Sequence, residues 1–600
     1  MKKTIKIFLL ILFITCIVGD SIAQKKKTKK VSTSQRFKTK KKQTSTKKKI
    51  STTKSKKNVK PSTKNNIKAI TAVKNESLPD TSASKIVVIT SAFKPSLQYA
   101  AKINFTAATE VVDITKVPIS YKVPSSNLFF SYQPIAIQPL ALPADSVKGW
   151  INNQRIKIGA GNLNTIYGEG KFSFGDGKKS ITSIQADYLS SKSTLFAQQY
   201  SKLNLDLLSI LNSSNDFEWT AHAFFNSITQ YKFGFKPSTL NYSKDQLKQT
   251  YNTVALEVGL KNKQVNESGI NFHPQLSYYR FTDNNSSSEN NLILKAPIEK
   301  ELTKLLSFKL AFDVDIANIN LQTTPSRNIT NNLFSINPAV VFTTPNIKLN
   351  IGLRPSWDNT VYSMLPDITA ESKLKNTNIS LEAGWIGYFN KNNWRSLIAF
   401  NPWIGSFSTI LNTKIREQFI GVKGVAGNHI SFNSRLSFIK MDNQPLFLND
   451  AIDGKSFVTL YEPTMNALKL HGEFGYTVQE NLSFLASATF TQYNALSINS
   501  EAWGLVPLEI TASTLWKPIK DLQIKADLFY LGGSMYKTAT TPISRLSPGL
   551  DLNIGGEFSV KKNLNIWLQM NNLFNNTYQR WNQYPVFGFN VLAGVVYSFK

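Results

Sequence analysis

The sequence has one cysteine, four histidines and no long apolar run. Cys16, the single cysteine, lies in an N-terminal leader, so the mature chain is expected to have no disulfide bond and no thiol chemistry. No internal run reaches the roughly eighteen apolar residues that a membrane-spanning helix requires. This absence does not exclude a membrane protein, because the strands of a membrane barrel alternate in polarity and leave the mean hydropathy near neutral.

Residues 1–23 are typical of a signal peptide. Basic residues at the start precede an apolar run, and Ala23 ends a small-x-small cleavage site. A lipid anchor on Cys16 is the alternative, but Thr15 stands where a lipoprotein signal has a small residue next to the cysteine. The chain is therefore expected to be exported from a Gram-negative cell.

Residues 24–75 form a tail rich in lysine, serine and threonine. Nineteen basic residues and no acidic one occur between 24 and 68, so more than half of the net charge of +32 lies there. This composition predicts disorder in the periplasm. An exported protein seldom meets nucleic acid, so we expect no such partner. A solvated tether and attachment to an anionic envelope polymer, to acidic lipid headgroups or to a periplasmic protein stay open.

Residues 76–147 are too apolar for a free linker, with pairs such as Phe129-Phe130. Their closely spaced prolines disfavour helices and central strands, so this periplasmic segment is predicted to be extended. We expect it to lie on the rim of the folded domain, in a barrel lumen or on a partner. The prolines in question are Pro118, Pro124, Pro134, Pro139 and Pro143.

Residues 148–600 contain successive strand-sized runs in which apolar and polar residues alternate. In residues 306–316 the even positions are all apolar, and the odd positions carry serine, lysine, alanine and two aspartates. Period two is the period of a strand with one face on an apolar phase. A soluble β-protein alternates too, but runs of about 9–12 residues match a tilted strand that crosses a bilayer. The fold class predicted is all-β, a large antiparallel transmembrane barrel of roughly twenty to twenty-four strands.

Turn lengths support a barrel. A tight turn at 561–563 contrasts with longer polar loops expected at 282–290 and 533–546, and short turns alternate with long loops in membrane barrels. Glycines at both ends of 168–170 and of 175–177 predict two further hairpin turns.

The polar faces of several runs place charged side chains on the expected lumen wall. A ring of such charges can select solutes, and simple solvation of a wet wall is the alternative. The candidate lumen residues are Lys309, Asp313, Asp315, Arg435, Lys525, Asp527 and Glu557.

Sequence motifs for chemistry are missing. His222, His273, His429 and His471 fall on separate predicted strands or turns without a second ligand at metal spacing. Neither a Gly-x-Ser-x-Gly nucleophile elbow nor a glycine-rich phosphate loop occurs. We expect no enzyme activity, no cofactor and no metal site.

The C-terminus resembles a known family. Residues 571–578 (NNLFNNTY), Tyr584-Pro585 and an alternating strand that ends in Phe599 resemble the end of TonB-dependent outer-membrane receptors. Two departures are Phe587-Gly588-Phe589, where the family has Pro-Gly-Arg, and Lys600 after the final aromatic residue. This resemblance implies a barrel of 22 strands in the outer membrane.

The region before the barrel resembles a plugless group of such barrels from Bacteroidetes. Only about seventy ordered-looking residues precede the first alternating strand, too few for the family's plug, and no TonB box is visible. Residues 85–103, 159–165 and 416–424 are also similar to this group. The resemblance implies architecture and location more than activity.

Two functions follow as expectations. The first is a channel or transport component of the envelope, whose wide lumen must be filled by residues 76–147, by inward loops or by a partner. The second is a structural barrel that binds periplasmic or cell-surface partners in an outer-membrane complex.

Overall fold

The computed structural model describes residues 152–213, 216–264, 266, 268–323 and 325–599. The expected signal peptide, the lysine-rich tail and the segment 76–147 lie outside these residues, so their assignments stay predictions. No helix in the described residues is long enough and apolar enough to cross a membrane.

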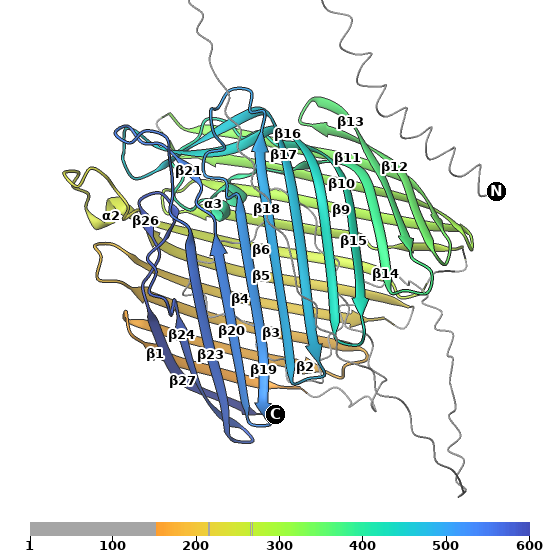
Figure 1. Ribbon diagram of the computed structural model, residues 1–600, viewed down its shortest axis with the longest axis horizontal. Helices are drawn as coiled ribbons and strands as arrows, with labels where there is room; N and C mark the ends of the chain where they lie inside the picture. The colour runs from red at the N-terminus through yellow and green to blue at the C-terminus, as the bar shows by residue number, and fades with distance from the viewer. Residues whose placement is uncertain (1–151, 214–215, 265, 267, 324, 600) are drawn as a thin grey trace, which may run out of the picture. The chain divides into compact units, whose positions relative to one another are not determined.

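The described residues form a closed antiparallel barrel of 22 strands, as the sequence predicts (Figure 1). Strands β7 and β8 share one position because both pair with β9, on either side of a break at His273-Pro274. The first positions are β1 (Gln154–Gly161), β2 (Thr165–Gly175), β3 (Ser180–Lys192), β4 (Gln199–Asn212), β5 (Phe217–Tyr231), β6 (Lys248–Asn262), β7 (Ile270–Phe272), β8 (Gln275–Asp283), β9 (Ser288–Thr303), β10 (Leu306–Leu321) and β11 (Arg327–Thr343). The remaining positions are β12 (Ile347–Asp358), β13 (Val361–Lys373), β14 (Ile379–Asn390), β15 (Thr413–Ala426), β16 (Ile430–Asn449), β17 (Phe457–Val478), β18 (Leu482–Asn494), β19 (Leu508–Ile519), β20 (Leu522–Leu531), β23 (Gly549–Lys561), β24 (Leu564–Asn571) and β27 (Asn590–Phe599).

The barrel closes where β27 pairs with β1, and this seam is reinforced from inside. Trp567 of β24 reaches across β27, and its indole nitrogen donates to the carbonyl oxygen of Ile158 on β1 at 3.2 Å. The indole fills the space that a side chain at Gly159 would occupy. The backbone of Gly594 packs closely against the backbone of Ile158 and Gly159 on β1. Glycine is required at this close approach because any side chain would occupy the volume of the partner strand.

The outward face of the strands is an apolar belt. Alternate residues such as Ile158, Leu205, Val254 and Leu353 are exposed, whereas their neighbours face the interior. Exposed aromatic side chains lie toward both ends of the belt, as in membrane barrels. They include Phe174, Trp219, Trp516 and Tyr597 at one end and Tyr188 and Tyr362 at the other.

The two ends of the barrel differ in their connections. The end that holds the first residue of β1 and the last of β27, here called the near end, has mostly short turns such as 304–305, 520–521 and 562–563. The opposite, far end has five long loops. These loops are 232–247, 391–412, 495–507, 532–548 and 572–589.

Two turn predictions were wrong in detail. Residues 168–170 lie inside β2, where Glu169 is buried on the inward face and accepts a hydrogen bond from Tyr167. Their glycines fit a strand because the open outward face leaves room beside Gly168. The loop expected at 282–290 is a four-residue turn, since β8 and β9 extend into it and Asp283 accepts the backbone N–H groups of Asn285 and Ser287.

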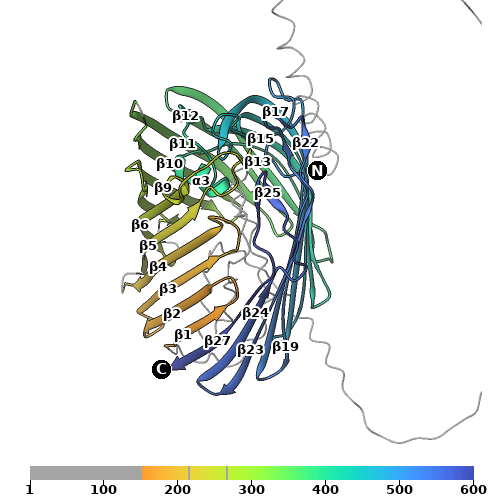
Figure 2. The same cartoon turned by 90° about the vertical axis from the view of Figure 1, so that its left-hand side faces the viewer.

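The far-end loops contain the remaining short elements. The two helices are α2 (Lys244–Leu247) and α3 (Trp394–Phe400). The short strands are β21 (Met535–Tyr536), β22 (Ser544–Arg545), β25 (Gln579–Trp581) and β26 (Tyr584–Pro585). In both views α3 lies within the ring of strands (Figures 1 and 2), so the loops fold inward across the mouth.

Candidate functional site: a loop cap over a charged lumen

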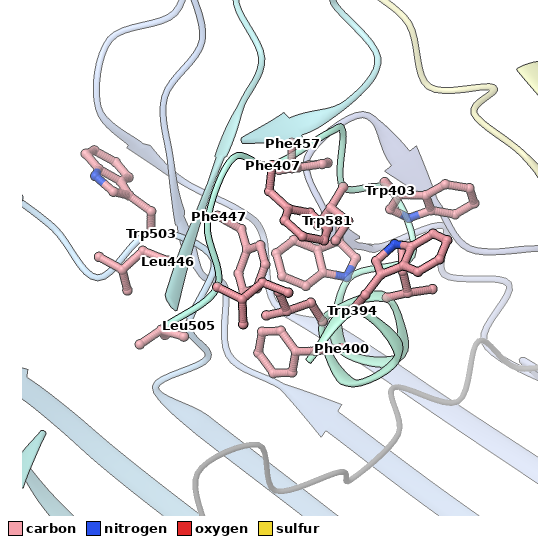
Figure 3. Close-up of a cluster of buried hydrophobic side chains, with 14 of the residues drawn as sticks. Trp394, Phe400, Trp403, Phe407, Leu446, Phe447, Phe457, Trp503, Leu505 and Trp581 are labelled. Atoms are coloured by element: carbon pink, nitrogen blue, oxygen red, sulfur yellow. The ribbon is translucent and has the colours of Figure 1, made fainter. Parts of the chain in front are cut away.

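The far-end loops meet in one hydrophobic core inside the mouth of the barrel, which we call the loop cap. It comprises residues of the five long loops and of the adjoining ends of β16 and β17, and Figure 3 shows its aromatic centre. The turn 450–456 joins it through a hydrogen bond between Ser456 and Lys232.

Trp581 is at the centre of the loop cap, 2% exposed, with its ring against Phe400, Phe447 and Phe457 at centroid distances of 5.4–5.6 Å. These partners come from three different segments of the chain, so the side chain of Trp581 contacts all three segments at once.

A second aromatic contact lies at the side of the cap. Trp403 and Tyr584 stack with ring centroids 4.1 Å apart, and Phe233 packs edge-on against both. Stacked and edge-on aromatic pairs stabilise a fold beyond their buried area. The loops 232–247, 391–412 and 572–589 are therefore joined to one another.

Helix α3 lies in the middle of the loop cap. Asn393 caps its N-terminus, because its side chain accepts the backbone N–H of Ser396 at 2.7 Å and so satisfies one of the free N–H groups at that end. At the first turn the backbone N–H of Arg395 donates to Glu289 on the barrel wall at 3.0 Å. The helix is thus held by the wall as well as by the loops.

Polar contacts fasten the loop 391–412 to the wall. Lys391 lies 2.6 Å from Asp315, one of the predicted lumen charges. Asn412 donates to Asn331 on β11 and to Asp358 on β12, both at 2.7 Å. Buried polar groups of this kind fix one arrangement of the loop, because each needs its partner.

Lys232 is a buried cation inside the cap. Its ammonium donates to the carbonyl oxygen of Ile404 at 2.9 Å and to the hydroxyl of Ser456 at 2.8 Å. Burial lowers the pKa of Lys232 to about 8, although the charge of Asp453 opposes this shift. The closed cap therefore favours the neutral amine more than water does.

This shift predicts a cap that becomes more stable as the pH rises. Below pH 8 the lysine is protonated in both the closed and the open cap, and the closed cap bears the full cost of burying the charge. Between pH 8 and about 10.4 only the closed cap releases the proton, so its stability rises by up to about 3 kcal/mol. The stability of the closed cap can be compared at pH 7 and pH 10 by limited proteolysis of the loops in urea.

The matched control is Lys232→Met, which keeps a long unbranched side chain, one atom shorter than lysine, and removes the charge. Its cap should resist proteolysis equally at both pH values after correction for the protease. A wild-type cap that opens equally at pH 7 and pH 10 would contradict the assignment.

The predicted lumen charges are distributed around the inner wall, on β10, β16, β20 and β23. Asp315 lies beneath the cap and Asp313 accepts a hydrogen bond from Ser335 at 3.2 Å. The other five take part in ion pairs within one strand, between adjacent strands or, for Arg155 on β1 and Glu557 on β23, across two intervening strands. These pairs are Lys309–Glu299 (3.6 Å), Arg435–Glu417 (2.9 Å), Lys525–Asp527 (3.7 Å) and Arg155–Glu557 (2.9 Å). The structure therefore does not gather the seven residues into one site, and solute selection by them stays a prediction.

A cavity of about 240 Å³ adjoins α3 on the inner wall of β5, β6, β8 and β9. Its lining holds charges of both signs, namely Glu257, Lys295 and Arg395. The guanidinium of Arg395 lies 4.7 Å from the ring centre of Tyr279. Such a mixed wall can hold a small polar solute below the cap.

The histidines are scattered. His222 lies 2.7 Å from Asp206, His471 lies 3.2 Å from Glu473, and the other two lie near turns of the near end. Among the described residues, no group of three or more His, Cys, Asp or Glu side chains could hold a metal ion.

Sequence reasoning proposed candidate lumen charges, whose role stays a prediction, and missed the loop cap. A usable signal was present, because aromatic residues gather in segments without period two. Such segments are 394–407, 446–457 and 581–584. Aromatic residues in long irregular loops indicate that these loops have a core of their own.

No family model and no curated protein matches the sequence. Solved structures do match the fold. The FrpB iron transporter from Neisseria meningitidis is 12% identical, with a TM-score of 0.57, over 75% of this chain and 82% of that one. The ferric enterobactin receptor (PfeA) from Pseudomonas aeruginosa is 12% identical, with a TM-score of 0.56, over 75% and 81%.

The ferripyoverdine receptor of the outer membrane of Pseudomonas aeruginosa is also 12% identical, with a TM-score of 0.56, over 75% of this chain and 72% of that one. At such identities the likeness establishes the fold and leaves the activity open. The barrel of this chain therefore has the fold of TonB-dependent-receptor-like outer-membrane β-barrels.

Proposed function

We propose that this protein is a gated channel or transport component of the outer membrane, with the loop cap as its gate. One observation carries the proposal, namely a hydrophobic cap across the mouth of a lumen whose wall is lined by ion pairs. A charged wall suits the passage of water and polar solutes, and a cap made of loops can separate without breaking the barrel.

The orientation follows from the connections. Membrane barrels of bacteria have short periplasmic turns and long outer loops, so the cap faces the outside and the near end faces the periplasm. The expected N-terminal tail would then lie in the periplasm. The three similar barrels are an iron transporter and two receptors for ferric chelates, which supports uptake of a solute from outside.

A disulfide across the cap tests the gate. A Cβ atom built on Gly405 lies 3.4 Å from Cβ of Ser456, close to the spacing that a disulfide requires. Gly405→Cys with Ser456→Cys would join the loop 391–412 to the turn 450–456. Cys16, the only natural cysteine, lies in the expected signal peptide, so no natural thiol should compete in the mature chain.

Conductance in planar bilayers gives the measurement. The oxidised variant should stay closed under voltage or mild urea that opens the wild type, and the same protein after reduction should open again. The reduced sample is the matched control. Equal opening of oxidised and reduced protein would refute gating by the cap. A parallel form that lacks residues 24–147 separates a block by the N-terminal segment from a block by the cap.

The second candidate is a structural barrel that anchors periplasmic or surface partners, with the tail bound to an anionic polymer or a periplasmic protein. The missing TonB box and the many contacts within the cap favour it. If the wild type, the reduced variant and the truncated form all show no conductance, the structural role would be favoured over transport.

A further inference from the structure

Three cations lie on the outer wall of the barrel toward the far end. Lys414 and Arg416 belong to β15 and Lys440 belongs to β16. The residues between and beside them are buried on the inward side, so these three side chains face outward. The buried neighbours are Ile415, Glu417, Ile439 and Met441.

Register brings the cations together. Arg416 is directly opposite Lys440, and Lys414 is directly opposite Asp442. The Asp442 carboxylate lies 3.0 Å from Lys414 and 3.1 Å from Arg416. Lys440 is exposed, and in the described part of the chain it forms no ion pair within 4 Å. We call these four residues the rim cluster.

The rim cluster has fewer anions than its charges require. The cluster contains three cations but one carboxylate, Asp442, which pairs with Lys414 and Arg416 only. Arg416 and Lys440 are like charges on opposed positions of neighbouring strands, an arrangement that destabilises a sheet. A bound anion between them would reverse that repulsion. Arginine with an adjacent lysine suits a phosphate, because the guanidinium fork forms paired hydrogen bonds with its oxygens.

The position of the rim cluster along the barrel, relative to the apolar belt, indicates the source of the anion. On the same outward face, toward the near end, the wall becomes apolar at Ile420 and Phe438, each 61% exposed. Arg416 is four residues from Ile420, about 13 Å along the strand. The cations therefore lie directly above the lipid belt, where the headgroups of the outer leaflet would lie.

We propose that the rim cluster binds a phosphate of an anionic lipid in the outer leaflet. Arg416 and Lys440 hold the phosphate, Lys414 keeps Asp442 in place, and the apolar wall below receives the acyl chains. The inference rests on the orientation of the barrel and is independent of gating by the loop cap.

Native mass spectrometry of delipidated full-length protein tests the proposal, with diphosphoryl lipid A as the probe. Wild type should bind one lipid tightly, and Arg416→Gln with Lys440→Gln should weaken this binding by about tenfold or more. Asp442→Asn removes the competing carboxylate and should strengthen binding, which a folding defect could not produce. Lys300→Gln with Lys562→Gln, at exposed lysines of the near end, is the matched control.

Phosphatidylcholine, whose phosphate is balanced by the positive charge of choline, distinguishes recognition of an anionic headgroup from general lipid adhesion. Weaker binding of phosphatidylcholine, unaffected by the rim variants, would support the site. Equal affinity of wild type and the Arg416/Lys440 variant for lipid A would overturn the proposal, and so would an equal loss in the near-end control.

Discussion

Gly594→Val is expected to prevent closure of the barrel. A Cβ atom at this position would overlap the carbonyl oxygen of Ile158 and lie only 2.6 Å from Cα of Gly159. Both obstacles are backbone atoms of β1, so they can give way only if β1 separates from β27. The cost should exceed about 3 kcal/mol, at the upper end of what overpacking costs in a core. Loss of the compact, heat-sensitive band in gel electrophoresis would show the effect.

Gly168→Val is the matched control for the seam. Nothing lies within 4 Å of a Cβ atom at Gly168, because this glycine faces outward on β2. The same substitution two strands away should therefore leave the closed barrel intact and even add apolar surface to the belt. Normal folding of Gly594→Val would show that the seam is looser than its geometry indicates.

Trp581→Ala should open the loop cap and leave the barrel closed. The indole contacts three aromatic side chains from different segments, and the guanidinium of Arg580 lies 4.1 Å from its ring centre. Removing a buried tryptophan from such a site costs about 3–5 kcal/mol. A core made of loops has few other contacts to make up this loss. We expect rapid proteolysis within 391–412 and 572–589.

The control for Trp581→Ala is Trp516→Ala on the outward face at the near end, where the side chain is 46% exposed. This variant loses a similar area of contact with lipid but none with the loops. Its cap should resist protease as the wild type does. Equal protease sensitivity of the two variants would mean that the cap does not depend on Trp581.

The barrel could be predicted because the alternation of apolar and polar residues within each strand shows which side chains face outward and which face inward. In β10 the even residues from Leu306 to Ile316 face outward and are apolar, whereas the odd residues face inward, so a shift by one position would expose Asp313 and Asp315 to hydrocarbon. The strand number followed from resemblance, since alternation alone gave a range. The hairpin turn predicted at residues 168–170 was wrong because the sequence does not distinguish glycines in a hairpin turn from glycines on the open face of a strand.

The loop cap could not be predicted because its contacts join distant segments. Phe400 and Trp581 meet although 181 positions separate them, and no local period marks either one. The lumen charges were visible on their strands, but their partners were not. Arg155 and Glu557 are 402 positions apart, and only closure of the barrel brings them within 2.9 Å.

Pairing of the first strand with the last also sets the order of assembly. The chain is exported with its N-terminus first, so the edge of β1 waits until the final residues arrive, more than 400 positions later. Throughout that interval an unpaired edge invites aggregation or pairing with another chain. We therefore expect biogenesis to depend on a chaperone that shields this edge. Because the loops can meet only across a completed ring, protease resistance of the mouth would mark molecules that have finished folding.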